Sequence, residues 1–227
     1  PPEISHTTKP IRFVEDGFIR SIGLGSKHVP PLSLNFDYKT AYFDARKESD
    51  LEYLLSTYDF SSDPNLIERA RKNIVDIVSH GLSKYNSARR IDTRKIYPAK
   101  KDRKRILVVG QVEDDASIIY GCDVRWTNND VVKLAVFENP DAEVHYKPHP
   151  DVLHGKRKAI SNLEEVQGLC YVITENIALA DVLETIDHVY TITSQVGIEA
   201  LIRKIRVTTI GCPFYAGWGL TDDRQEN

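Results

Sequence analysis

Short apolar runs alternate with amphipathic segments along the second half of the chain. The most apolar run, residues 106–109, lies between a basic stretch and a glycine, and this pattern predicts a strand buried on both faces of a parallel sheet. Strands alternating with helices predict a Rossmann-like α/β half. The other expected strands are 143–147, 170–173, 188–192 and 206–210, and the expected helices are 127–137, 177–186 and 197–203.

The first half of the chain has shorter β-type segments. A strand is predicted at 11–14, and it runs into two acids and a glycine at 15–17. The runs 32–36 and 41–43 predict a hairpin around the turn 37–39. Acids that directly follow a strand are free to point into a cleft.

Two helix starts are visible in this first half. Ser49 and Glu52 have the spacing of a capping box, so a helix is expected to begin there. Asp63 and Pro64 have the cap-then-proline pattern, and the helix they begin is expected to end at Gly81. Apolar residues recur at helical spacing between these ends, which predicts that this second helix belongs to the core.

A strongly basic stretch separates the two halves. Residues 89–105 carry many Lys and Arg side chains together with Pro98, which predicts a linker between residues 1–88 and residues 106–227. Two interpretations of its charge remain open: a solvated face, or attraction to an anionic acceptor or to the anionic inner leaflet of a membrane.

Composition narrows the function classes. The 227 residues carry a net charge of −3, which gives no argument for nucleic-acid binding. Three cysteines without CxxC spacing are typical of a reducing compartment, and no pair of histidines has HExxH spacing, so no metal is expected. No signal peptide and no apolar run of about 18 residues is visible. With no methionine, the chain is expected to be a domain of a longer protein.

An amide and three adjacent acids follow the 106–109 strand: Gln111, Glu113, Asp114 and Asp115. In open α/β sheets, small molecules bind outside the carboxyl ends of the strands, so a ligand is expected here. Three neighbouring carboxylates repel one another, which favours a functional role, with a solvated acidic turn as the alternative.

His149 follows the next strand and lies between Pro148 and Pro150. Both prolines fix their own φ and lack an amide donor, so the imidazole is held in an extended bend at the same sheet edge. Such a histidine is suited to contact a phosphate oxygen or a leaving group. A turn histidine bonded to local backbone is the alternative.

The segment 191–201 combines a strand, a hydroxyl-rich turn and a helix. A single phosphate is expected at Ser194 and Gln195, because the first amides of a helix have no intrahelical partners. Glu199 lies one turn further and is expected to reach a ribose diol. The alternatives are an N-cap at Ser194 and a helix-surface carboxylate at Glu199.

Aromatic and small residues alternate near the end of the chain. Tyr215 and Trp218 offer stacking faces, and the glycines beside Trp218 permit close backbone approach. A hydrophobic plug between domains is the alternative interpretation.

With these residues assembled, the chain resembles the bacterial capsule polysaccharide proteins of the KpsC type, and most closely their carboxyl-terminal module. The matching stretches run from near the first residue to near the last. They are 15–26, 30–34, 83–86, 110–118, 146–153 and 213–223.

The resemblance implies a GT-B-like fold, with two Rossmann-like halves facing a cleft and an incomplete amino-terminal half. It implies a retaining transferase that moves Kdo, an eight-carbon acidic sugar, from CMP-Kdo onto a (lyso)phosphatidylglycerol-linked oligo-Kdo acceptor. Further expected partners are a second transferase module in the parent chain and other capsule assembly proteins. The implied location is cytoplasmic and peripheral at the inner membrane. By the same resemblance, this stretch of sequence is expected not to include the first strand and helix of the amino-terminal half or the closing helices that follow Asp223 in the family.

The family's Q-x-x-x-D pattern falls on Gln111 and Asp115, which makes Asp115 the implied nucleophile. By the same resemblance, the H-P pair is His149 and Pro150, and the hydroxyl turn is Thr193 with Ser194. Arg20, Tyr215 and Trp218 are expected to line the cleft on the acceptor side.

Chemistry gives these residues consistent roles. Lys147 and His149 would neutralise the leaving phosphate without a divalent ion. Retention requires two inversions, so a carboxylate nucleophile at Asp115 would form a glycosyl-enzyme. Glu15 or Asp16 would then deprotonate the acceptor hydroxyl, with Glu15 favoured. The competing hypotheses are another nucleotide-sugar transferase or epimerase of similar fold, and a non-catalytic module that binds glycans or lipid surfaces.

Overall fold

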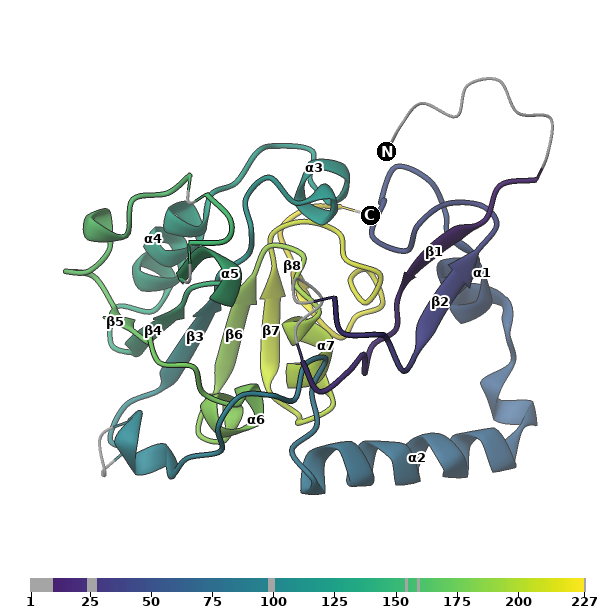
Figure 1. Ribbon diagram of the computed structural model, residues 1–227, viewed down its shortest axis with the longest axis horizontal. Helices are drawn as coiled ribbons and strands as arrows, with labels where there is room; N and C mark the ends of the chain where they lie inside the picture. The colour runs from purple at the N-terminus through teal and green to yellow at the C-terminus, as the bar shows by residue number, and fades with distance from the viewer. Residues whose placement is uncertain (1–9, 24–27, 98–100, 154, 159, 227) are drawn as a thin grey trace.

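The larger part of the molecule is built on a parallel six-stranded sheet (Figure 1). The computed structural model describes residues 10–23, 28–97, 101–153, 155–158 and 160–226. The strand order is β5-β4-β3-β6-β7-β8. The strands are β3 (Arg105–Val109), β4 (Glu143–Lys147), β5 (Tyr171–Val172), β6 (His188–Thr191), β7 (Arg206–Thr209) and β8 (Asp222–Asp223).

Helices cover both faces of this sheet. Ile106 and Val108 of β3 face a core shared with α3 and α4, while Leu107 and Val109 face the opposite core with α6 and α7. This alternation on a strand buried throughout is the reason for its unbroken apolar sequence. The helices are α3 (Ala116–Gly121), α4 (Asn128–Glu138), α5 (Pro150–Leu153), α6 (Leu179–Leu183) and α7 (Val196–Leu201), with a 3-10 turn at Leu163–Glu165.

The predictions for this half are confirmed, with ends that differ by a few residues. The predicted parallel strands and the helices between them are all present, and Thr127 caps α4 through a capping box with Asp130. The edge strand β8 was not predicted, because two acidic residues carry no strand pattern. The α/β fold is therefore established by the parallel sheet itself.

The amino-terminal portion is smaller and lacks a Rossmann-like sheet among its described residues. β1 (Phe13–Asp16) pairs antiparallel with β2 (Leu34–Asp37). Two helices follow, α1 (Asp50–Thr57) and α2 (Pro64–Ser79), with 3-10 turns at Phe60–Ser62 and Thr93–Lys95. This content agrees with the expectation of an incomplete amino-terminal half.

The predicted hairpin of 32–36 with 41–43 is wrong. β2 pairs with β1 instead, and residues 41–43 lie in a turn. The Asp37 side chain accepts hydrogen bonds from the amides of Lys39, Thr40 and Asp50, and these bonds fold the chain away from a second strand. The strand expected at 11–14 is shifted to Phe13–Asp16, so the two acids belong to its end.

The helix α2 begins and ends as predicted but does not belong to the core. Asp63 caps it, Pro64 is its first residue, and Gly81 beyond its end adopts a φ of 61°. None of its residues is buried, and Val75 is 63% exposed. Figure 1 shows α2 at the side of the molecule, away from the large sheet. The spacing of its apolar residues defined a face, and no described element covers that face.

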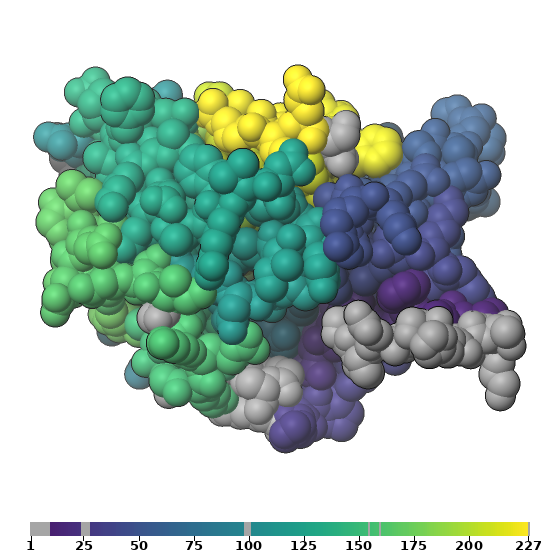
Figure 2. All heavy atoms as spheres, turned by 90° about the horizontal axis from the view of Figure 1, so that it is seen from above, coloured from purple at the N-terminus to yellow at the C-terminus, as the bar shows by residue number. Residues whose placement is uncertain are grey.

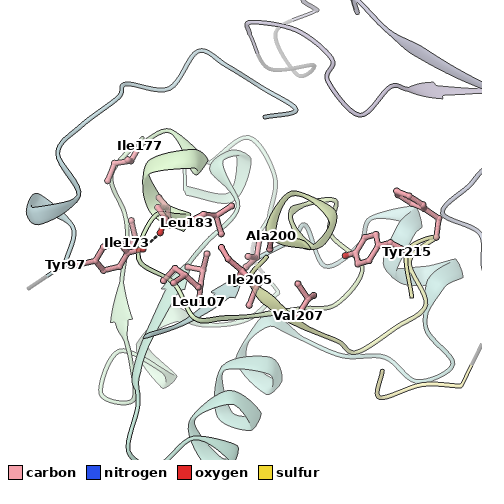
Figure 3. Close-up of a cluster of buried hydrophobic side chains, with 14 residues drawn as sticks. Tyr97, Leu107, Ile173, Ile177, Leu183, Ala200, Ile205, Val207 and Tyr215 are labelled. Carbon is pink, nitrogen blue, oxygen red and sulfur yellow. Dashed lines mark hydrogen bonds between the residues drawn. The ribbon is translucent and has the colours of Figure 1, made fainter. Parts of the chain in front are cut away.

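Part of the basic stretch before β3 is held against α6. Asp181 of α6 accepts from Nε of Arg90 and from the amide of Ile91. Tyr97 is 2% exposed and donates its hydroxyl to the carbonyl of Val182. Figure 3 shows the Tyr97 ring beside Ile173 at the edge of the α6–α7 core. Pro98 lies outside the described residues, and the domain boundaries remain an expectation.

The amino-terminal portion, purple to blue in Figure 2, lies against the larger portion. Aromatic contacts join the two. The ring of Phe18 stacks on Phe214 with centroids 4.8 Å apart, and Tyr42 meets Phe214 edge-on at 5.6 Å. Because Phe214 is 8% exposed, this contact removes apolar surface from water and fixes the amino-terminal portion beside the sheet.

Among the described residues, no helix is both long and apolar enough to cross a bilayer.

We predict that Ser49→Ala lowers the free energy of unfolding by about 1 kcal/mol, because Ser49 and Glu52 satisfy each other's backbone amides at the start of α1. Urea unfolding measures this change. Ser87→Ala is the matched control, since Ser87 is exposed. Equal stabilities of the two variants would contradict the role of the cap.

Candidate functional site

A cleft of about 460 Å³ lies at the carboxyl ends of β3, β4 and β6, facing β1 and the turn at 83–86. Parallel strands end at the same sheet edge, which gathers side chains that are far apart in sequence. Twelve of the fourteen predicted site residues line this cleft: Glu15, Asp16, Gln111, Asp115, Lys147, His149, Pro150, Thr193, Ser194, Gln195, Glu199 and Tyr215.

The three acids that follow β3 have three different environments. Glu113 is buried and accepts from the amides of Asn128, Ile160 and Ser161, so it anchors the loop at 160–161. Asp114 forms an exposed ion pair of 2.7 Å with Arg157, which lowers the pKa of the Asp114 carboxyl. Asp115 is the acid of this group that lines the cleft.

Asp115 is held by the helix that follows it. Its Oδ1 accepts from the amide of Ser117 at 2.9 Å and from the Ser117 hydroxyl at 2.8 Å, as the N-cap of α3. Among the described residues, no hydrogen bond is made to Oδ2. The cap fixes one carboxylate oxygen and leaves the other for a ligand, which suits a nucleophile on a rigid support.

Gln111 connects the ends of two strands. Its Oε1 accepts from the Thr193 amide at 2.8 Å, and its Nε2 donates to the Thr193 hydroxyl at 3.1 Å. The backbone amide of Gln111 donates to Asn128 Oδ1 at 2.9 Å. Gln111 is 7% exposed, so these bonds are made in a water-poor environment, where they hold β3 and β6 at a fixed spacing. Gln111, predicted to bind the donor, thus also fixes the hydroxyl turn through its two hydrogen bonds to Thr193.

His149 and Lys147 form the β4 side of the cleft. The His149 Nδ1 accepts from the Asp151 amide at 3.2 Å, so the neutral ring carries its proton on Nε2. Burial lowers the pKa of His149 and also that of Lys147, whose Nζ donates to the carbonyl of Glu175 at 3.3 Å. Pro150 is the first residue of α5, the helix that continues from this bend.

The turn after β6 presents acceptors with no partner among the described residues. Glu199 is 6% exposed, and its Oε1 accepts from the Lys84 amide at 3.1 Å while its Oε2 has no hydrogen bond. Oε1 of Gln195 is buried and equally without a partner, while its Nε2 donates to the carbonyl of Phe18. Burial raises the pKa of Glu199 to about 7. Unpaired buried acceptors in a cleft are suited to receive ligand hydroxyls.

The turn and helix differ from the expected N-cap arrangement. Gln195 occupies the cap position of α7 without a side-chain cap bond, and Ser194 Oγ accepts from the Val196 amide at 3.2 Å. The hydroxyl of Tyr215 donates to the carbonyl of Ser194 and fixes the turn from behind. Tyr215 is 2% exposed, so it packs as a wall residue.

The opposite wall carries the two acids at the end of β1. Asp16 is paired with Nε of Arg20 at 2.7 Å. Glu15 makes no ion pair or side-chain hydrogen bond among the described residues. Burial raises the pKa of Glu15, the charges of Asp16 and Asp115 raise it further, and Lys84 lowers it. A carboxylate with a raised pKa and a free lone pair is the better proton acceptor, which favours Glu15 over Asp16 as the base.

Two of the predicted residues lie outside the cleft. Arg20 is 8% exposed and donates to the Ser21 hydroxyl and to the Val29 carbonyl, so it holds Asp16 from behind. Trp218 is 40% exposed, and its indole donates to the Phe214 carbonyl at 2.8 Å. In both cases the polar tip is used within the fold.

Lys84 was not assigned a role from sequence, although it lies in the 83–86 stretch that carries the resemblance. It lines the cleft, and burial lowers its pKa while Asp16, Glu15 and Asp115 raise it. A turn lysine is usually solvated, and local sequence gives no signal that three acids surround it. Among the described residues, no group of three or more His, Cys, Asp or Glu side chains is arranged to hold a metal ion.

The chain is similar to several known proteins along nearly its whole length. The model of the capsule polysaccharide biosynthesis protein family matches residues 4–227. The lipopolysaccharide-processing protein LpsZ of Rhizobium meliloti is 53% identical over 216 residues, and the capsule polysaccharide modification protein LipA of Neisseria meningitidis serogroup B is 41% identical over 214 residues. These alignments cover 95% and 94% of the chain. They cover 49% of LpsZ and 30% of LipA, so the chain spans about half the length of the first relative and less than a third of the second.

Two solved structures from Thermosulfurimonas dismutans KpsC share the fold. One, a beta Kdo 2,4 transferase, has a TM-score of 0.84 and 36% identity over 96% of this chain and 66% of its own. The other, a beta Kdo 2,7 transferase, has a TM-score of 0.75 and 35% identity over 97% of this chain and 64% of its own. The resemblance inferred from sequence motifs is thereby confirmed.

We predict that Glu199→Gln flattens the pH dependence of stability. The pKa of Glu199 is raised from 4.5 to about 7 in the folded protein, so the folded state binds more protons than the unfolded state between these values. Its contribution therefore favours folding at low pH, and stability falls as pH rises toward 7, by on the order of 3 kcal/mol.

Urea unfolding at pH 5 and pH 8 measures this difference. The Gln variant should lose it, while Glu68→Gln on the exposed helix α2 should keep it. An unchanged slope in Glu199→Gln would contradict the raised pKa.

Proposed function

Because the chain belongs to the capsule polysaccharide biosynthesis protein family, we propose that it is a retaining glycosyltransferase that moves Kdo from CMP-Kdo onto a lipid-linked Kdo acceptor. The observation that carries the proposal is the meeting of Asp115, His149 and Glu15 in one cleft, from three separate elements. The fold shared with two Kdo transferases of the KpsC type supports the choice of sugar.

The donor is proposed to bind along the sheet edge. His149 Nε2–H and the Lys147 ammonium lie at the end of β4, where they would contact the single phosphate of the nucleotide. The unpaired oxygens of Glu199 and Gln195 would accept hydrogen bonds from the ribose hydroxyls. These contacts place the anomeric carbon between the phosphate site and Asp115. The cations neutralise the leaving group, so no step requires a metal ion.

In the first step, the free oxygen of Asp115 attacks the anomeric carbon. The bond from that carbon to the phosphate oxygen breaks, and CMP leaves with the electron pair, stabilised by His149 and Lys147. The product is an ester between Asp115 and Kdo. The Ser117 bonds to Oδ1 hold the carboxylate during this attack.

In the second step, Glu15 takes the proton of the acceptor hydroxyl, and the oxygen attacks the same carbon. The ester bond breaks and the carboxylate of Asp115 is restored, so two inversions give net retention. The position of Glu15 on β1, across the cleft from β3, supports this division of roles. Because the proposed acceptor is lipid-linked, the proposed place of action is the cytoplasmic membrane surface. The proposed partners are other capsule proteins and a second transferase module of the parent chain.

We predict that Asp115→Ala abolishes Kdo transfer and the covalent adduct while CMP still binds. The substitution removes the nucleophile but none of the proposed phosphate or ribose contacts. Mass spectrometry after incubation with CMP-Kdo detects the adduct, and calorimetry measures CMP affinity. Asp114→Ala is the matched control, because Asp114 is exposed and bonded to Arg157. Full turnover in Asp115→Ala would remove this residue from the mechanism.

We predict that Glu15→Gln slows transfer by roughly 100-fold or more and makes the sugar adduct accumulate, because the base acts only in the second step. Asp16→Asn tests the alternative base at the next position. Adduct accumulation in Asp16→Asn but not in Glu15→Gln would reverse the assignment.

A further inference from the structure

The turn at 83–86 is held between the two portions of the molecule. The carbonyl of Lys84 accepts from the amides of Arg20 at 3.1 Å and Ser21 at 3.3 Å, while its amide donates to Glu199. Asn86 closes the turn, with Oδ1 accepting from the Ser83 amide at 2.9 Å. The backbone of Lys84 is therefore fixed by both walls of the cleft.

The side chain of Lys84 contrasts with this fixed backbone. Among the described residues, its ammonium makes no hydrogen bond and no ion pair within 4.0 Å. The ammonium lies over the Tyr85 ring, with Nζ 5.7 Å from the ring centroid. Burial lowers its pKa, so part of its hydration has been lost. A half-buried cation without a bonded anion is costly unless a ligand supplies one.

The other charged side chains of the cleft indicate where an anionic group of the ligand would bind. Asp16 is neutralised by Arg20, and Arg157 by Asp114. The phosphate site at His149 and Lys147 lies on the β4 side. Lys84 instead lines the cleft together with Asp16, Glu15 and Asp115, and the charges of these acids favour its protonated form. The reacting carbon must lie among these same acids.

A 2-keto-acid sugar carries its carboxylate directly on the reacting anomeric carbon, whereas an aldose donor has a hydrogen there. We propose that Lys84 binds this carboxylate and so selects ulosonic acid donors. The inference rests on the proposed function and adds the residue that distinguishes this donor class. The cation also offsets the repulsion between the donor carboxylate and the carboxylate of Asp115 that attacks beside it.

The test compares CMP with two CMP-linked 2-keto-acid sugars, which carry the carboxylate. CMP, CMP-Kdo and CMP-N-acetylneuraminate are titrated by calorimetry into Asp115→Asn protein, which cannot form the ester, with Lys84 intact or replaced. Lys84→Met should weaken the two sugar nucleotides by roughly 10- to 100-fold and leave CMP within about twofold. Lys84→Arg should retain most of the affinity. Lys72→Met on α2 is the control for a general loss of charge.

The outcomes separate this inference from the proposed function. Equal losses for CMP and the sugar nucleotides in Lys84→Met would overturn the inference, because Lys84 would then act on the nucleotide or on the fold. No loss for any ligand would overturn it as well. If CMP-N-acetylneuraminate responds to Lys84 while CMP-Kdo does not bind more tightly than CMP, the carboxylate contact stands and the Kdo assignment fails.

Discussion

The parallel pairing of β3 with β4 and β6 is the constraint on which the cleft depends. Arg105–Val109 pairs in register with 143–147, and 106–108 pairs with 188–190, so the three strands end at the same edge of the sheet. Gln111 then joins the ends of β3 and β6 through Thr193. Buried backbone pairing therefore fixes the strand ends after which the acid, the imidazole and the hydroxyl turn follow. The α3 cap and the Gln111 bonds then hold Asp115 and Thr193 in the segments beyond those ends.

The charged side chains of the cleft fall into two sets. One set has hydrogen-bond or ion-pair partners within the fold, and the other keeps an atom without a partner. Glu113 accepts hydrogen bonds at both carboxylate oxygens, and Asp114 and Asp16 are each paired with an arginine within the fold. One oxygen of Asp115, one of Glu199 and the Lys84 ammonium lack such partners among the described residues. Of these groups Glu199 is buried, and a buried polar atom left without a partner calls for an explanation. A donor with one phosphate, one carboxylate and several hydroxyls would satisfy all of them.

Sequence patterns predicted the elements whose determinants are local. An unbroken apolar run indicated β3, and short β-type segments alternating with helical patterns indicated the other parallel strands except β8. The residue pairs at 49 with 52 and 63 with 64 indicated the helix starts. Predictions failed where strand pairing or helix burial depends on residues far away in the sequence. The partner of β2 is β1, some 20 residues earlier, and the apolar face of α2 shows its orientation without showing what covers it. Lys84 was missed for the same reason, since its acidic neighbours come from β1 and from the end of β3.

The most direct test of the proposed donor site is a crystal structure of the protein with CMP bound. We expect the phosphate within hydrogen-bonding distance of His149 Nε2 and Lys147 Nζ, and the ribose hydroxyls on Glu199. The free oxygen of Asp115 should face the phosphate oxygen that carries the sugar in the donor. A nucleotide bound away from the carboxyl ends of β3, β4 and β6 would contradict this account.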